Sequence, residues 1–178
     1  MTLNRWFAVL VSTAALIGCV ETTDPSAVNR MNATWAGRGW SGDASAVVLK
    51  NLPGGDRLYL SATGPSPIRS AAWWSPDNAV WANLISVEVP FKGVGTYVLA
   101  PGSATFKEMT GGDVLDATYS IAPQTTGTLV ITSYEPDGII EGTLSFDAVS
   151  SNPYRSFGDR ASLEDAHFRA QVQPGFLL

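Results

Sequence analysis

The sequence has very few of the residues that build metal, redox and nucleophilic sites, with one Cys and one His among 178 residues. A structural zinc site takes about four ligands, mostly Cys and His, so a conventional zinc site is excluded, as are an internal disulfide and a Cys/His couple. Charge is also scarce at 15%, and 16 acidic residues outnumber 11 basic ones, which leaves a formal net charge of -5. Nucleic-acid binding requires a basic surface. We therefore expect no nucleic-acid partner, no metal and no cofactor.

The chain is nevertheless built to fold, because 45% of its residues are hydrophobic and 10% are aromatic. That composition is too apolar for a disordered protein, and the length suggests one domain or two small ones.

The N-terminus has the pattern of an export signal. Residues 1–5 carry one side-chain cation, and residues 6–17 are apolar except for Ser12 and Thr13. A membrane-spanning helix needs about 20 apolar residues, so this shorter run is typical of a secretory signal peptide.

The apolar run ends in Leu16-Ile17-Gly18-Cys19, which resembles the lipobox of bacterial lipoproteins. The resemblance implies cleavage of a signal peptide, residues 1–18, and lipidation of Cys19, so that the lipid bilayer is a partner and the protein is anchored to the cell envelope. In enterobacterial lipoproteins an Asp after the Cys directs retention in the inner membrane. Here Val20 follows, which implies the outer membrane by analogy and leaves the leaflet open. The alternatives are an ordinary signal peptide with an incidental Cys, or an uncleaved anchor.

Residues 19–29 form the lipidated Cys and a polar tether containing Pro25. The remainder, residues 30–178, is the expected folded domain.

A period of two residues recurs throughout this domain, and no stretch of about 12 or more residues has helical periodicity. The plainest example is 140–148, where apolar Ile140, Gly142, Leu144, Phe146 and Ala148 alternate with polar residues. The sequence predicts nine or ten strands in all, over residues 31–35, 44–50, 57–63, 80–90, 96–100, 103–109, 114–121, 128–134, 140–148 and 166–172. The fold class is therefore all-β.

Three segments with Gly and Asp or Pro separate neighbouring strands and predict hairpin turns, at residues 53–56, 110–113 and 135–138. An antiparallel meander of this size closes into a barrel or folds into two packed sheets. We expect a two-sheet sandwich or a flattened barrel, with Trp35, Trp40 and Trp81 in or beside the core.

The segments 32–35 (Asn-Ala-Thr-Trp), 95–99 (GTYVL), 127–132 (GTLVIT) and 140–148 (IEGTLSFDA) together resemble an uncharacterised family of small all-β bacterial lipoproteins. The resemblance covers most of the mature chain and implies fold and location. It implies no activity and no catalytic residues.

Residues suited to catalysis are few. His167 shares a strand face with Arg169 and Gln171, which favours a solvated position over a catalytic one. No nucleophile elbow, phosphate loop or calcium loop occurs. Neighbouring carboxylates could act as an acid/base pair, but solvated turn charges are the simpler interpretation; these pairs are Asp113 with Asp116 and Glu164 with Asp165. We expect no enzyme.

One loop, residues 63–78, contains three Pro residues around Trp73 and Trp74. Indole rings can stack on sugars, or they can cover the open end of a β-structure. The sequence therefore predicts a non-catalytic envelope module that binds a ligand or partner, such as a polysaccharide or another envelope protein. The alternatives are a glycan-binding module that uses Trp73 and Trp74, and a carboxylate-based hydrolase.

Overall fold

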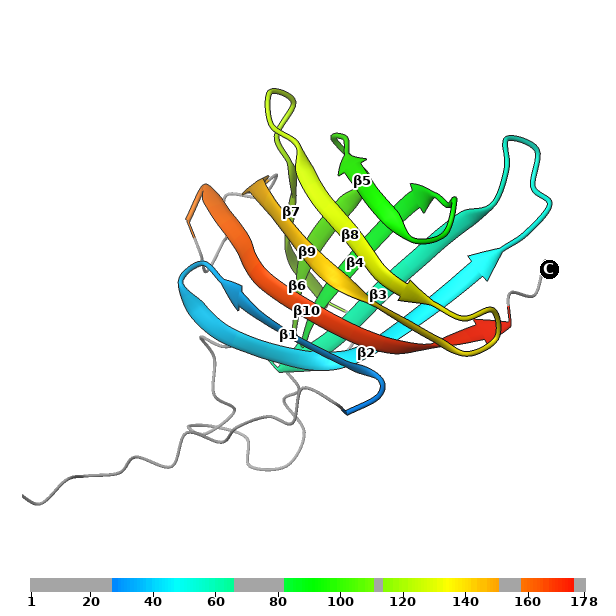
Figure 1. Cartoon of the computed structure of the whole chain (residues 1–178). Coiled ribbons are helices and arrows are strands. Elements are labelled where there is room, and N and C mark those ends of the chain that lie inside the picture. Colours follow the sequence, from blue (N-terminus) through cyan, green and yellow to red (C-terminus); the bar gives the residue numbers. More distant parts are fainter. Residues whose placement is uncertain (1–26, 66–81, 111–113, 151–157, 175–178) are drawn as a thin grey trace, which may run out of the picture.

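Alternating apolar and polar residues form ten β-strands in the computed structural model, which describes residues 27–65, 82–110, 114–150 and 158–174 (Figure 1). The strands are β1 (Arg30–Trp35), β2 (Arg38–Leu49), β3 (Arg57–Pro65), β4 (Ala82–Pro90), β5 (Gly95–Leu99), β6 (Ala104–Thr110), β7 (Val114–Ile121), β8 (Gly127–Tyr134), β9 (Ile139–Ser150) and β10 (Arg160–Pro174). Within these segments no helix is long and apolar enough to cross a membrane. The all-β prediction is confirmed.

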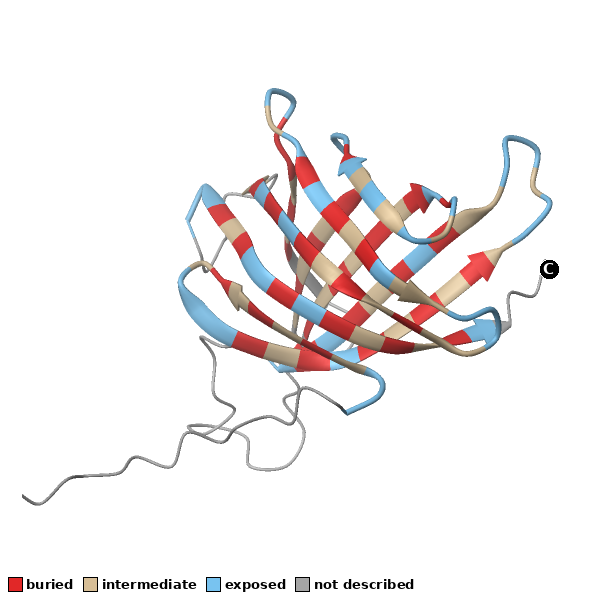
Figure 2. Ribbon diagram, in the orientation of Figure 1, coloured by how far each residue is buried: buried red, intermediate tan, exposed pale blue. Residues whose placement is uncertain are grey.

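Burial alternates along the strands as the period of two predicts, and Figure 2 shows it as bands of contrasting colour. All five predicted inward residues of β9 are buried, while the intervening Ser145 and Asp147 are exposed. The same holds for Leu58 and Leu60 in β3 and for Ile85 in β4. The inward and outward faces predicted for these strands are therefore confirmed.

The sheet closes into a barrel. Seven strands follow one another through hydrogen-bonded pairs in the order β2-β3-β4-β6-β7-β9-β10, and β1 lies antiparallel to both β10 and β2. Beyond β1, residues 172–174 of β10 pair in parallel with residues 46–48 of β2. The result is a closed eight-stranded barrel in which β8 and β5 are additional strands. Of the two architectures that the sequence left open, the barrel is the one formed.

The predicted turns at 53–56 and 135–138 join paired antiparallel strands, β2 with β3 and β8 with β9. Strands β6 and β7 on either side of the third are also paired, but residues 111–113 lie outside the described residues. The meander, however, is interrupted at two places. Strand β4 pairs with β6 rather than β5, and β7 pairs with β9 as well as β6, while β5 lies against β8. Turn residues specify only local pairing, so these non-sequential neighbours had no sequence signal.

Two strands, β10 and β2, begin well before their predicted first residues. Strand β10 begins at Arg160 rather than 166, and its pairing with β9 shifts between Leu163 and Ala166, where Asp165 has a φ of 49°. This bulge changes which residues face inward and so hides the strand from a search for strict alternation. Strand β2 begins at Arg38 rather than 44.

Aromatic rings fill part of the barrel interior. Trp35 stacks on Phe106 with ring centroids 3.8 Å apart, and Tyr119 meets Trp35 edge-on at 5.5 Å. Phe146 lies 6.3 Å from Trp35. Trp35 and Trp40 are buried, as predicted for core residues, and Trp81 lies outside the described residues.

Candidate functional site

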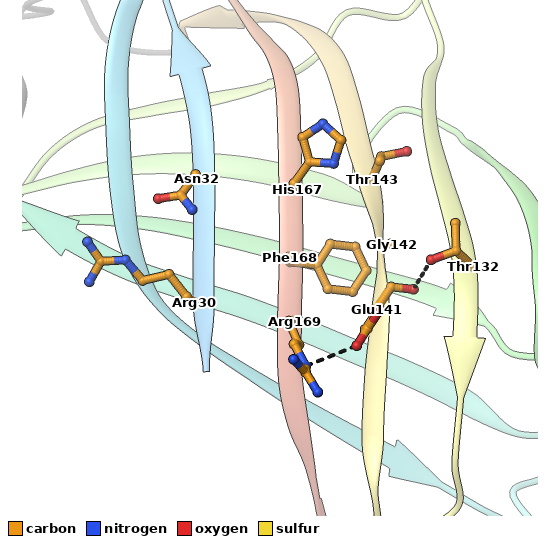
Figure 3. A pocket seen from close by; sticks show the side chains of 9 residues that line it. All are labelled: Arg30, Asn32, Thr132, Glu141, Gly142, Thr143, His167, Phe168 and Arg169. Carbon is orange, nitrogen blue, oxygen red and sulfur yellow. Dashed lines mark hydrogen bonds and ion pairs between the residues drawn. The ribbon is translucent and has the colours of Figure 1, made fainter. Parts of the chain in front are cut away.

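A groove of about 370 Å³ lies across β1, β10, β9 and β8, and most of the side chains around it are outward-facing and polar (Figure 3). The residues that line it are Arg30, Asn32, Thr132, Glu141, Gly142, Thr143, His167, Phe168 and Arg169. Strands that are far apart in sequence meet here, because β10 lies between β1 and β9.

Strand register places the polar residues in two rows across the sheet. In the first row Arg30 of β1 is opposite Arg169 of β10, which is opposite Glu141 of β9. In the second row Asn32 is opposite His167, which is opposite Thr143. Successive residues of a strand face opposite sides, so residues two apart in each strand present their side chains on the same face.

The charged row contains two arginines directly across from each other, a pairing that is unfavourable on a sheet. Each guanidinium is held by a different neighbour. Nε of Arg169 lies 2.9 Å from a carboxylate oxygen of Glu141, and Nη2 of Arg30 donates to the hydroxyl of Ser41 at 2.9 Å. In Figure 3 the Arg30 side chain accordingly extends away from Arg169.

The second row contains a polar atom that lacks a partner. Oδ1 of Asn32 is buried and has no hydrogen-bond partner, whereas His167 beside it is exposed. Buried polar atoms in folded proteins are almost always hydrogen-bonded, so an acceptor of this kind at the edge of a groove calls for an explanation.

A β-bulge in β8 places Thr132 at the edge of the groove opposite β1. The pairing of β8 with β9 shifts between Ile131 and Ser133, and Thr132 at this point donates its hydroxyl to the backbone carbonyl of Glu141 at 3.2 Å. The bulge re-aims the Thr132 side chain toward β9.

Among the residues singled out from the sequence, His167 lies where predicted, on a polar face shared with Arg169 and Gln171. Glu164 and Asp165 are exposed at the β10 bulge and do not line the groove. Cys19, Trp73, Trp74 and Asp113 lie outside the described residues, and the side chain of Asp116 is likewise not described. In the part of the chain that is described, no group of three or more His, Cys, Asp and Glu side chains could hold a metal ion.

The alternating pattern of each strand had already placed Glu141, Thr143, His167 and Arg169 on polar faces. The pattern could not predict that these residues lie side by side, because that depends on the pairing of β10 with both β1 and β9, which are distant in the sequence. Arg30 and Asn32 lie at the beginning of the domain and carried no functional signal of their own.

The chain gave no match to any protein-family model, to any curated protein or to any solved structure. Its resemblance to small all-β bacterial lipoproteins stays a prediction.

Proposed function

We propose that this protein is a lipid-anchored module of the bacterial cell envelope that binds a ligand or partner without catalysing a reaction. The observation that carries the proposal is Leu16-Ile17-Gly18-Cys19 at the end of the apolar N-terminal run. Two or three acyl chains on Cys19 would hold the protein at a bilayer, since each buried CH₂ contributes about 0.8 kcal/mol.

The distance from anchor to barrel supports a location close to the membrane. Strand β1 begins at Arg30, and a chain spans at most about 3.5 Å per residue. The segment from Cys19 to Arg30 therefore reaches no more than about 40 Å at full extension. Arg30 also lines the groove, so the groove lies at the tethered end of β1.

The composition of the groove favours binding over hydrolysis. Glycosidase chemistry uses two carboxyl groups on either side of the scissile bond. The groove is lined by one carboxylate, Glu141, and it is ion-paired with Arg169. Side chains that donate and accept hydrogen bonds without an acid/base pair are suited to holding a ligand.

Acyl labelling tests the anchoring directly. Replacing the thiol in Cys19→Ser should abolish incorporation of labelled palmitate and leave an uncleaved precursor, while Val20→Ala should be labelled like the wild type. Unchanged labelling of Cys19→Ser would overturn the proposal.

A further inference from the structure

The groove concentrates positive charge on an acidic protein. The chain has a formal net charge of -5, yet the groove is lined by two arginines, Arg30 and Arg169, and by a single carboxylate, Glu141. Both side chains of the Arg169–Glu141 pair are partly exposed to solvent, by 34% and 40%. Local positive potential of this kind attracts anionic ligands even where the whole molecule is negative.

Both arginines line the groove, but their guanidinium groups turn away from each other. They are register partners on adjacent strands, and repulsion is avoided because Arg30 turns to Ser41 and Arg169 to Glu141. A bound anion would offset this repulsion and allow both guanidinium groups to turn toward it. The bond to Ser41 uses one of the five N–H donors of Arg30. A planar oxyanion is the group that a guanidinium binds best, through two parallel hydrogen bonds.

The second row of the groove complements hydroxyl groups. Oδ1 of Asn32 is a buried acceptor without a partner, His167 is opposite Asn32 on β10, and Thr143 is opposite His167 on β9. If the Asn32 amide turned toward β10, a ligand hydroxyl could donate to Oδ1 and satisfy that atom. The two rows together therefore match a ligand that carries an oxyanion next to several hydroxyls.

We propose that this groove binds an acidic saccharide, with the sugar carboxylate toward Arg30 and Arg169 and the hydroxyls toward Asn32, His167 and Thr143. This inference deepens the proposed binding function by naming the class of ligand. A volume of about 370 Å³ lies near the lower end of the range of about 300 to 1,000 Å³ found for small-ligand pockets, so the groove suits a short saccharide.

An anionic lipid headgroup offers the same oxyanion chemistry, but one feature favours the saccharide. Thr132, at the bulge in β8, bounds the groove on one side, which suits an isolated ligand better than a flat membrane surface.

The test is calorimetric titration of the full chain in detergent with oligogalacturonate, with its methyl-esterified form as the neutral control. We expect binding of the acid form only. Arg30→Gln should weaken it about tenfold, as expected for loss of a charge-assisted contact. Arg38→Gln removes an exposed arginine outside the groove and should leave affinity unchanged.

Glu141→Gln should change the affinity for the saccharide in the opposite direction to Arg30→Gln. The carboxylate of Glu141 competes with the ligand for Arg169, so its removal should strengthen binding several-fold, a result that a purely structural role for Glu141 would not produce. A gain in Glu141→Gln together with a loss in Arg30→Gln supports the proposal.

Four results would overturn it. The first is an equal loss of binding in Arg30→Gln and Arg38→Gln, and the second is competition by inorganic phosphate as strong as that by the saccharide. The third is Arg30-dependent binding to phosphatidylglycerol vesicles in place of the saccharide. The fourth is binding that is lost in Trp73→Ala/Trp74→Ala and kept in Arg30→Gln. None of these results changes palmitate labelling of Cys19, so failure of this inference is distinguishable from failure of the proposed anchoring.

Discussion

Trp35 contributes to the barrel through its ring contacts as well as its size. Its indole is fully buried, stacks on Phe106 and meets Tyr119 edge-on. Aromatic pairs of these geometries add about 0.5 to 1.5 kcal/mol beyond the burial of their area. Because Trp35 comes from β1 and Phe106 from β6, the contact joins strands that do not pair with each other in the sheet.

Phe146 is the inward residue of β9 that reaches this aromatic cluster, and it is 3% exposed. Phe146→Ala should lower the free energy of unfolding by about 3 to 5 kcal/mol, because it removes a buried ring and leaves a cavity. Ser145→Ala, on the exposed face, should change it by no more than about 0.5 kcal/mol. Denaturant titration measures both, and equal effects would place β9 one residue out of register.

Strand β9 is the element on which both the barrel and the groove depend, since it pairs with β7, β8 and β10. Its close approach to β8 requires glycine. A Cβ at Gly142 would collide with the carbonyl oxygen of Val130 and would lie 2.8 Å from the Phe168 ring.

Gly142→Ala should therefore destabilise the protein by about 1 to 3 kcal/mol or more through overpacking. Gly39→Ala in β2 is the matched control, because a Cβ there meets nothing within 4 Å, and it should be nearly neutral. Thermal denaturation of the two variants compares them. Similar melting temperatures would show that β8 and β9 are not so closely packed.

The strands themselves could be predicted because a sheet with one buried face imposes alternation, as β9 shows without a break. Alternation fails where the backbone is irregular, as at Asp165 in β10. It also carries no information on which distant strands pair. The groove depends on the placement of β10 between β1 and β9, so its residues could be assigned to outward faces but not to a common site.

At the scale of the whole molecule, the eight-stranded barrel is closed, and the additional strand β5 forms an edge because it pairs with β8 alone among the described strands. The ends of such a barrel need covering. Trp73 and Trp74 lie in the connection between β3 and β4, outside the described residues, and the sequence predicts that they either cover an end or form a stacking platform.

We expect Trp73 and Trp74 to cover an end of the barrel. Trp73→Ala/Trp74→Ala should then lower the free energy of unfolding by several kcal/mol, since truncation of a buried Trp costs about 3 to 5 kcal/mol. Thermal denaturation beside a polysaccharide pull-down makes the comparison. An unchanged melting temperature with loss of polysaccharide binding would contradict this role and support the platform.

The proposed anchoring can be tested most directly by the intact mass of the protein purified from a bacterial envelope. We predict that the mature chain begins at Cys19 and carries the mass of a diacylglyceryl group and, where the new amino group is acylated, of a third acyl chain. A chain that begins at Met1, or one cleaved elsewhere with a free thiol at Cys19, would contradict the central claim that this barrel is held at a membrane by lipid.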